Sequence, residues 1–381
     1  MPKKLTKNQT TPMPKAQETI LEIDLSALKH NFDYLKSKLQ PNSTKFLAVV
    51  KAFAYGNDAN EIALYLQNLR VDYFAVAYTN EGVALRKAGI TKPILVLHPL
   101  ETCLTTLIDY QLEPSIYSAK ILDEFLQVAA DRDQKNYPIH LKFNTGLNRL
   151  GFAENAIENL HSKLHKIKTV KIKSLFSHLA ASEDLNEKVF TQQQIASFKQ
   201  IAKKFNATFG FMPMLHLCNT SGILNYPDAH FDMVRSGIGL YGFGNSEEEN
   251  RNFRPIASLK SVISQIHHIE AGETVGYNRG YKSTSAIKSA TIPIGHADGI
   301  GRQYGHGKGC LIINGKKAPI IGNVCMDMVM VNITDIDCQE GDEVIVFDAS
   351  HTAEDLASSV DTISYELITA ISQRVRRVVK K

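Results

Sequence analysis

Short apolar runs alternate with longer segments of helical periodicity from about residue 20 onward. The segment that ends at Leu39 has the helical pattern, because its apolar residues recur every three or four positions. These residues are Leu28, Phe32, Leu35 and Leu39. Either Asp24 or Ser26 can cap this helix, and further helices are predicted near residues 60–69 and 80–88.

The apolar runs between these helices are rich in β-branched residues and are apolar at consecutive positions, which indicates strands buried on both faces. The runs comprise residues 20–23, 46–50, 73–77, 93–97, 139–143, 172–176, 215–217 and 233–235. About eight β–α units in roughly 235 residues match a (β/α)8 TIM-type barrel, which takes roughly 250 residues. A doubly wound open sheet shows the same alternation and remains the competing fold.

The pattern changes after about residue 255, where strand-like runs are separated by glycine-containing turns such as Asn314-Gly315. These runs comprise residues 290–294, 310–313 and 343–347, and a helix with Ile363, Leu367 and Ile371 on one face closes the chain. The predicted fold class is therefore α/β, a barrel followed by a mainly β C-terminal domain. We expect a disordered N-terminal extension at 1–18, the barrel at 19–254 and the β-rich domain at 255–381.

Composition excludes several classes of protein. With 43 basic and 39 acidic side chains among 381 residues, the net charge is only +4, and no interior basic run suggests nucleic-acid binding. The five cysteines are widely spaced, which argues against a zinc site or a disulfide scaffold and fits a reducing compartment. Neither a secretory signal nor an apolar stretch of membrane-spanning length is present, so we expect a cytoplasmic protein.

Lys51 is the first candidate for chemistry, since it directly follows the apolar run 46–50. Barrels place their active sites at the C-terminal ends of their strands, where a lysine amine can form an imine with an aldehyde cofactor. By itself, Lys51 is equally consistent with a surface lysine at a strand end.

Seven segments in consistent order give Lys51 a context, and together they resemble the alanine racemases. Residues 49–56 resemble the cofactor-lysine motif of that family, and residues 139–151 and 233–242 resemble its next two segments. The C-terminal landmarks of the family are matched by residues 276–277, 295–299, 324–327 and 364–367. The resemblance extends from about residue 20 to 377. It implies the same (β/α)8 barrel and β domain, with pyridoxal 5'-phosphate as cofactor.

The resemblance implies two catalytic residues. Lys51 would bind pyridoxal phosphate and act as one base, and Tyr277 of a partner subunit would act as the other from the opposite face of the substrate. Racemisation requires this arrangement, because a proton leaves one face of Cα and returns on the other. Both side chains ordinarily titrate near 10, so each must be tuned before it serves as a base. Tyr281 is the rival of Tyr277, and only the motif register favours Tyr277.

The resemblance also implies how the cofactor is held. Arg235 would donate a hydrogen bond to the pyridine nitrogen and leave it unprotonated, which limits transamination. His178 would link Arg235 to Tyr277, although an isolated core histidine is the simpler interpretation. The remaining cofactor positions, mostly at the phosphate, are Tyr55, Asn219, Thr220, Gly237, Ile238 and Tyr365. Residues 237–242 also fit Gly-x-Gly-x-x-Gly, but this run does not open the fold, so a dinucleotide fingerprint is not indicated.

Three further positions correspond to substrate binding in the family. Arg149 would hold the substrate carboxylate, and Met326 would donate its backbone N–H to it. Lys142 matches a lysine that is often carbamylated, a change that would let it pair with Arg149. Asp327 either contacts the substrate together with these residues or supports the position of Met326 without touching the substrate.

Several residues depart from the family pattern without touching the proposed bases. They are Phe53, Asn57, Asn144, Asn148, His296 and Asn323. These departures concern the surroundings of the cofactor lysine and the entrance corridor, and therefore the strictness of the alanine preference.

The predicted function is alanine racemisation by two-base proton transfer, in a homodimer with shared active sites that supplies D-alanine for peptidoglycan. No metal, nucleic acid or membrane is expected to take part. A racemase of broader specificity with the same fold is the first alternative. A pyridoxal-phosphate decarboxylase, a non-catalytic pyridoxal-phosphate carrier and a barrel enzyme without this cofactor are the others. The β domain after residue 255 argues against the carrier.

Overall fold

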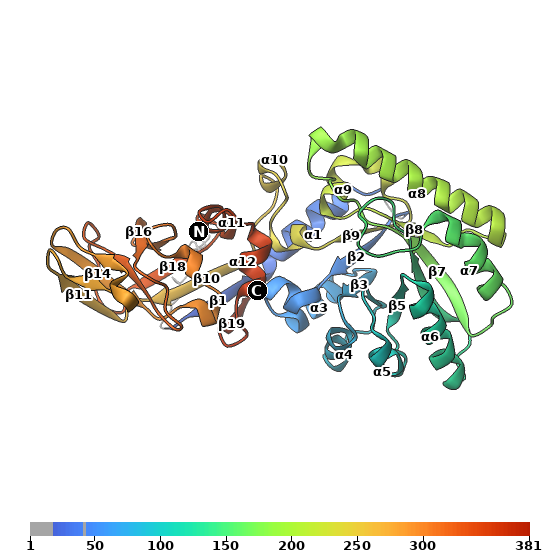
Figure 1. Cartoon of the computed structure of the whole chain (residues 1–381), viewed down its shortest axis with the longest axis horizontal. Helices are drawn as coiled ribbons and strands as arrows, with labels where there is room; N and C mark the ends of the chain where they lie inside the picture. The colour runs from blue at the N-terminus through green and yellow to red at the C-terminus, as the bar shows by residue number, and fades with distance from the viewer. Residues whose placement is uncertain (1–17, 41–42) are drawn as a thin grey trace, which may run out of the picture. The chain divides into compact units, whose positions relative to one another are not determined.

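The structure is a computed structural model that describes residues 18–40 and 43–381 (Figure 1). Nearly all of the extension predicted at 1–18 lies outside the described residues. The chain divides into two compact units. The barrel unit contains residues 23–257, 364–369 and 379–381, and the sheet unit contains the described residues up to 22, 258–363 and 370–378.

The barrel unit is a closed barrel of eight parallel strands, β2 to β9, in sequence order. The helices that follow the strands lie outside the barrel (Figure 1). The strands are β2 (Lys45–Val49), β3 (Tyr73–Val76), β4 (Ile94–Val96), β5 (Glu113–Ile116), β6 (Tyr137–Lys142), β7 (Val170–Phe176), β8 (Met214–His216) and β9 (Met233–Ser236). The main helices are α1 (Leu25–Ser37), α3 (Ala59–Asn68), α4 (Thr79–Lys87), α5 (Leu104–Asp109), α6 (Ala119–Asp131), α7 (Ile157–Leu164), α8 (Lys188–Phe209) and α9 (Thr220–Asn225). The predicted barrel is confirmed, and the doubly wound alternative is wrong.

Two of the strand assignments made from the sequence are wrong in detail. The run at 20–23 forms β1 (Ile20–Asp24), which pairs in the sheet of the other unit and not in the barrel. The barrel strand that the sequence analysis did not predict is β5, whose sequence Glu-Pro-Ser-Ile does not look like a buried strand. All four residues of β5 are nevertheless buried, because the polar side chains Glu113 and Ser115 are enclosed by the barrel.

The sheet unit contains a nine-stranded sheet in the order β11-β14-β17-β16-β15-β18-β10-β1-β19. Its strands after β1 are β10 (Ala257–Val262), β11 (Gln265–Ile269), β14 (Ile287–Ile292), β15 (Cys310–Ile313), β16 (Lys316–Ile321), β17 (Val329–Asn332), β18 (Glu343–Phe347) and β19 (Arg376–Lys380). A separate ribbon pairs β12 (Thr274–Val275) with β13 (Tyr281–Lys282). The mainly β character predicted for this region is confirmed.

Local signals explain several boundaries. Asp24 caps α1, since its carboxylate accepts from the amides of Ser26 and Ala27 at 2.7 and 3.0 Å. Asn314 and Gly315 both have positive φ, 47° and 76°, as the tight turn between β15 and β16 requires. The closing helix is shorter than predicted: α12 spans Ser364–Ala370, and Ile363 lies before it with 56% of its surface exposed.

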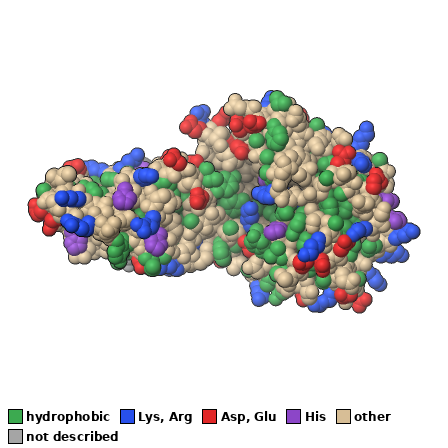
Figure 2. Space-filling model, viewed as in Figure 1, with side chains coloured by type: hydrophobic (Ala, Val, Ile, Leu, Met, Phe, Trp, Pro, Cys, Tyr) green, Lys and Arg blue, Asp and Glu red, His purple; other side chains and the backbone are tan. Residues whose placement is uncertain are grey.

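Charged side chains of both signs are interspersed over the face shown in Figure 2. Within residues 18–40 and 43–381, no helix combines the length and apolarity that crossing a bilayer needs.

Candidate active site

Lys51 is the second residue after the end of β2, and the backbone beyond it turns in the left-handed sense. Ala52, Phe53, Ala54 and Tyr55 all have φ between 52° and 56°. This conformation costs non-glycine residues about 1–2 kcal/mol each. The chain therefore concentrates backbone strain directly beside the lysine.

Two polar side chains hold this turn. Asn57 is buried and donates from Nδ2 to the carbonyl oxygens of Ala54 and Tyr55 at 2.8 and 3.2 Å. Glu81 accepts from the amide of Ala52 at 2.6 Å and, through its other oxygen, from the amide of Ala77 at 2.7 Å. The departure from the family pattern at Asn57 thus has a structural role in the turn that carries Lys51.

A cavity of about 670 Å³ opens beside Lys51 in the barrel unit. Every predicted site residue of this unit lines it: Lys51, Tyr55, Lys142, Arg149, His178, Asn219, Thr220, Arg235, Gly237, Ile238 and Tyr365. They come from the ends of β2, β6, β7, β8 and β9, from the loops that follow them, and from α12. Convergence at the C-terminal ends of the strands is the arrangement that barrel enzymes use.

The described charged side chains that line the cavity are all positive. Its described lining includes four cations, Lys51, Lys142, Arg149 and Arg235, and no carboxylate. Burial, followed by the charge of Arg149, lowers the pKa of Lys51 below its ordinary value. Burial, followed by the charges of Arg149, Arg235 and Lys51, lowers the pKa of Lys142 to about 8. Such a cavity favours anionic ligands and supplies amines that are readily deprotonated.

Arg235 is almost completely buried, and its guanidinium is fixed by several acceptors. Nη1 donates to Nδ1 of His216 at 2.8 Å, and Nη2 donates to the carbonyl oxygens of Ser177 and Leu217 at 2.7 and 2.9 Å. Nη2 also lies 3.2 Å from Nδ1 of His178. Burial lowers the pKa of Arg235 to about 10, which leaves it a cation at neutral pH.

Both histidines beside Arg235 are neutral. Burial, followed by the charge of Arg235, keeps the pKa of His178 and of His216 well below the ordinary value. Because an arginine can only donate, each Nδ1 that faces it must carry the lone pair. The predicted contact between Arg235 and His178 is present, whereas His216 was not predicted.

On another wall of the cavity, Gly237 leaves room for a tyrosine hydroxyl. A Cβ at position 237 would lie 2.1 Å from the hydroxyl oxygen of Tyr55. The Tyr55 ring stacks on Tyr241 at 4.5 Å between centroids, and the Tyr241 hydroxyl donates to the carbonyl of Val49 at 2.8 Å. Three hydroxyl-bearing residues, Tyr55, Thr220 and Tyr365, thus line the same cavity as Gly237, where the absence of a side chain lets a ligand approach the backbone closely, as a phosphate site requires.

Tyr277 and Met326, the two predicted site residues of the sheet unit, line a separate pocket there. Both are exposed, 74% and 59% respectively. Asn323 holds the turn of Tyr277, since its Nδ2 donates to the Tyr277 carbonyl at 2.9 Å. Oδ1 of Asn323 in turn accepts from Arg302 at 2.9 Å and lies 3.2 Å from Nε2 of His306.

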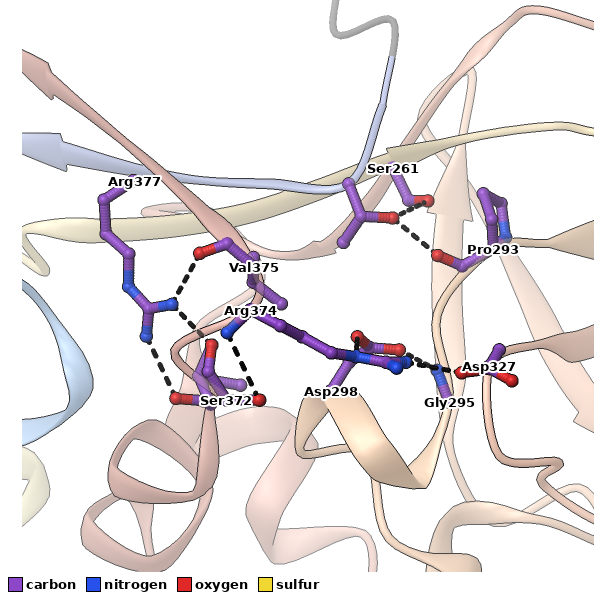
Figure 3. A network of polar contacts seen from close by, with 11 residues as sticks. Ser261, Pro293, Gly295, Asp298, Asp327, Ser372, Arg374, Val375 and Arg377 are labelled. Atoms are coloured by element: carbon purple, nitrogen blue, oxygen red, sulfur yellow. Dashed lines mark hydrogen bonds and ion pairs between the residues drawn. The ribbon is translucent and has the colours of Figure 1, made fainter.

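The segment of Met326 is tied to the end of the chain by a network around Arg374 (Figure 3). Arg374 donates from Nη2 to Asp327 and from Nε to Asp298, both at 2.7 Å. Asp298 also accepts from the amide of Gly295 at 2.8 Å. Of the two interpretations left open for Asp327, its contacts favour an anchor behind Met326.

Two of the remaining departures from the family pattern occur together. Asn144 donates from Nδ2 to Oδ1 of Asn148 at 2.8 Å, and its own Oδ1 accepts from the amides of Gly146 and Asn148 at 3.1 and 3.0 Å. The pair closes the turn that leads to Arg149. His296 is exposed, and its amide donates to the carbonyl of Cys325 at 3.0 Å.

Sequence reasoning missed His216, Glu81 and Asn245. Asn245 lines the cavity, and its Oδ1 accepts from the hydroxyl of Tyr365 at 3.1 Å. A single polar residue inside the short apolar run 215–217 was the available signal for His216. Nothing in the sequence distinguished Glu81 or Asn245 from surface polar residues.

Comparison with known proteins decides the family. Residues 23–244 match the family domain described as "Alanine racemase, N-terminal domain", and residues 256–379 match "Alanine racemase, C-terminal domain". The chain belongs to the alanine racemase family. Members of this family are isomerases, and the family predicted from seven sequence segments is confirmed.

Individual members of the alanine racemase family resemble the chain over nearly its whole length. The alanine racemase of Thermodesulfovibrio yellowstonii is 37% identical over 363 residues, which are 93% of this chain and 96% of that protein. The structure of the alanine racemase of Clostridium difficile 630 has a TM-score of 0.89 at 33% identity and covers 96% of both chains. The alanine racemase of Bartonella henselae, with covalently bound pyridoxal phosphate, has a TM-score of 0.86 at 28% identity, over 96% of this chain and 100% of that one.

The described residues contain no candidate metal site. Nowhere among them do three or more histidine, cysteine, aspartate or glutamate side chains form a group that could hold a metal ion.

Proposed function

We propose that this protein interconverts L-alanine and D-alanine with pyridoxal 5'-phosphate bound in the barrel cavity. The observation that carries the proposal is the cavity itself, where a lysine of lowered pKa follows a barrel strand among three further cations and no carboxylate. The phosphate of the cofactor and the carboxylate of the amino acid are the two anions that such a cavity suits. When bound, the cofactor supplies an electron-withdrawing ring that stabilises negative charge at the substrate Cα.

Lys51 and Arg235 would hold the two ends of the cofactor ring system. The Lys51 amine would bond to the cofactor aldehyde, and its lowered pKa favours the neutral nucleophile. Arg235, fixed by backbone carbonyls and by His216, would donate to the pyridine nitrogen and leave it without a proton. The phosphate would lie against Gly237, within reach of the other positions on that side of the cavity. These positions are Tyr55, Asn219, Thr220, Ile238 and Tyr365, while His178 would remain beside Arg235.

Two bases would act on opposite faces of Cα, Lys51 from one subunit and Tyr277 from its partner. Tyr277 lies in a pocket of the sheet unit with exposed apolar side chains, Met326 and Met328. Exposed apolar groups gathered around a candidate base fit a surface that a second subunit covers. The proposed enzyme is therefore a homodimer with shared active sites, in which one base comes from each chain.

The substrate carboxylate would be bound by Arg149 and by the backbone N–H of Met326. Lys142, with its pKa lowered to about 8, is partly neutral at physiological pH, and a neutral amine reacts with carbon dioxide to form a carbamate with loss of a proton. The resulting anion would face Arg149, one of the cations that lower the pKa of the free amine. We propose the cytoplasm as the location and peptidoglycan synthesis as the use of the D-alanine.

The decisive measurement is racemisation from each enantiomer, followed by chiral chromatography on the purified, cofactor-loaded protein. Convergence on an equal mixture from both sides, lost in Lys51→Ala and Tyr277→Phe, would support the reaction and both bases. Tyr281→Phe is the matched control in the sheet unit and should stay active. If serine or larger amino acids racemised at rates comparable with alanine, the alternative of broader specificity would replace the proposal.

Shared active sites can be tested by mixing the two inactive variants under conditions that exchange subunits. A mixed dimer of Lys51→Ala and Tyr277→Phe chains contains one active site with both bases intact, so about one quarter of the wild-type rate should return at equal amounts. A mixture that stays inactive after exchange has been verified would mean that Tyr277 acts within its own chain or not at all.

A further inference from the structure

Five consecutive barrel strands each contribute one polar side chain to a continuous hydrogen-bonded chain inside the barrel. The members are Glu113 on β5, His140 on β6, Ser174 on β7, His216 on β8 and Arg235 on β9. All five are buried, and three of them have no exposed surface at all. Only Arg235 lines the cavity, so the other four lie behind it.

The links are short from end to end. Oε2 of Glu113 lies 2.6 Å from Nε2 of His140, and Nδ1 of His140 lies 2.6 Å from Oγ of Ser174. The same Oγ lies 2.9 Å from Nε2 of His216, whose Nδ1 accepts from Nη1 of Arg235 at 2.8 Å. An irregularity in the register of β6 and β7 contributes to this continuity. Ile139 pairs with Ile172, but His140 pairs with Ser174, so one residue of β7 is skipped and the hydroxyl is brought opposite the imidazole.

Arg235 fixes the direction of the first two links, because a guanidinium has donors only. Nδ1 of His216 must therefore accept, and its Nε2 carries the hydrogen and donates to Ser174. We assign the hydrogen of the Ser174 hydroxyl to the link with Nδ1 of His140, so that Nε2 of His140 donates to the carboxylate of Glu113. Reversing the links would set an N–H of His216 against the N–H of Arg235. The hydrogen-bonded chain thus connects Arg235 to Glu113 through two imidazoles.

We propose that Glu113, His140 and Ser174 are positioning residues for Arg235, acting through His216 on the cofactor site. Ser174 binds Nε2 of His216 and is itself held by His140 and Glu113, so the imidazole ring is fixed with Nδ1 against Nη1 of Arg235. Glu113 ends the series of hydrogen bonds with a carboxylate acceptor, and a hydrogen bond to a charged acceptor is stronger than one to a neutral acceptor. Hydrogen-bonded groups in a dry interior polarise one another, so each link strengthens the next one toward Arg235.

The test uses ring-nitrogen NMR of histidine-labelled full-length protein together with the dissociation constant of pyridoxal phosphate. In the wild type, His140 and His216 should both carry hydrogen on Nε2 and none on Nδ1. Ser174→Ala interrupts the series of hydrogen bonds between His140 and His216 without replacing either imidazole. We expect it to leave His140 bound to Glu113, to leave the Nε2–H of His216 without its acceptor and so shift the signal of that nitrogen, and to weaken cofactor binding about tenfold. Glu113→Gln keeps an acceptor but removes the charge, and should weaken binding to a similar extent.

Tyr137→Phe is the matched control, since its hydroxyl donates to the carbonyl of Leu112 at 2.7 Å and lies outside the chain. It should alter neither the ring-nitrogen signals nor cofactor binding. Ser174→Ala and Glu113→Gln could lower only the urea midpoint and leave the ring-nitrogen signals of His216 and the dissociation constant of pyridoxal phosphate as in the wild type. The hydrogen-bonded side chains would then serve stability alone, and the proposal would be overturned. This inference rests on the proposed cofactor, but the tautomers are read without it. Failure of the wild type to bind pyridoxal phosphate would therefore contradict the proposed function separately.

Discussion

The hydroxyl oxygen of Tyr55 occupies the space that a side chain at Gly237 would need, 2.1 Å from the position of its Cβ. Tyr55 is held from the other side by its stack on Tyr241, and it is almost fully buried. Displacing the phenol ring would therefore disrupt the packing around it and cost free energy. A glycine is required at position 237 by close approach and not by backbone conformation, since its φ is −115°.

Gly237→Ala should displace Tyr55 and distort the wall of the cavity. We expect a loss of roughly 1–3 kcal/mol in the free energy of unfolding and a larger effect on pyridoxal-phosphate binding, because the ligand would meet both the methyl group and the displaced ring. Urea denaturation of the apoprotein and fluorescence titration with the cofactor measure the two effects. Gly210→Ala is the control for the cofactor titration: nothing lies within 4 Å of its Cβ, and its left-handed φ of 76° should lower stability without any effect on cofactor binding. Normal cofactor binding by Gly237→Ala would contradict the assignment of this wall to the phosphate.

Lys142 should make stability depend on pH. Its pKa of about 8 in the folded protein lies below the ordinary value of 10.5. Between these values the unfolded chain binds more protons, so the free energy of unfolding rises with pH there. Below pH 8 the buried charge is a full penalty, at most about 3 kcal/mol by the size of the shift. Lys142→Met removes the penalty, so its advantage over the wild-type apoprotein should be largest near pH 7 and should shrink toward pH 10.5.

The comparison requires urea denaturation in buffer free of carbon dioxide, with Lys171→Met on the exposed side of β7 as control. The control should differ from the wild type by the same amount at every pH. A difference for Lys142→Met that stays constant from pH 7 to 10.5 would show that the amine is not held neutral. Adding 13C-labelled bicarbonate should then produce a carbamate carbon signal in the wild type that is absent from Lys142→Met.

Asn323 departs from the family pattern, and Asn323→Asp tests whether its side chain positions Tyr277. The substitution replaces the Nδ2 donor, which binds the Tyr277 carbonyl, by an oxygen that repels it. We expect the racemisation rate to fall about tenfold, the equivalent of one lost hydrogen bond of about 1.4 kcal/mol. The urea midpoint should change little, since the turn is exposed. Asn314→Asp is the control, because that Nδ2 also donates to a carbonyl, at 2.9 Å, in the turn between β15 and β16. Equal rates for the two variants would remove Asn323 from the site.

Arg374→Lys should loosen the segment of Met326 without unfolding the protein. A lysine has one charged group and cannot hold Asp298 and Asp327 as the two edges of the arginine do. Exposed ion pairs add roughly 0–1 kcal/mol to stability, so the urea midpoint should fall only slightly. The KM for alanine should rise several-fold while kcat changes less, because Met326 is proposed to bind the substrate carboxylate. A loss of kcat with unchanged KM would contradict that role.

The sequence by itself determined which residues face the cavity. Lys142 and Arg235 lie within apolar strands and Lys51 lies two residues after one, and the carboxyl ends of parallel barrel strands meet at one end of the barrel. Strand-end position could therefore be predicted from hydrophobic patterning, and motif register supplied the rest of the list. The same rule failed for β5, because Glu113 and Ser115 break the apolar pattern by pointing into a barrel interior that only the closed fold creates.

Only the tertiary structure decided which polar groups meet across strands. His216, Ser174, His140 and Glu113 are far apart in sequence, and a one-residue irregularity between β6 and β7 sets whether two of them touch. Asn323 and Tyr277, or Arg374 and Asp327, are likewise separated by dozens of residues. Side-chain hydrogen bonds require partners within about 3 Å. Hydrophobic patterning along the sequence places helices and strands to within a residue or two. Which side chains come within hydrogen-bonding distance of each other is set only by the packed fold.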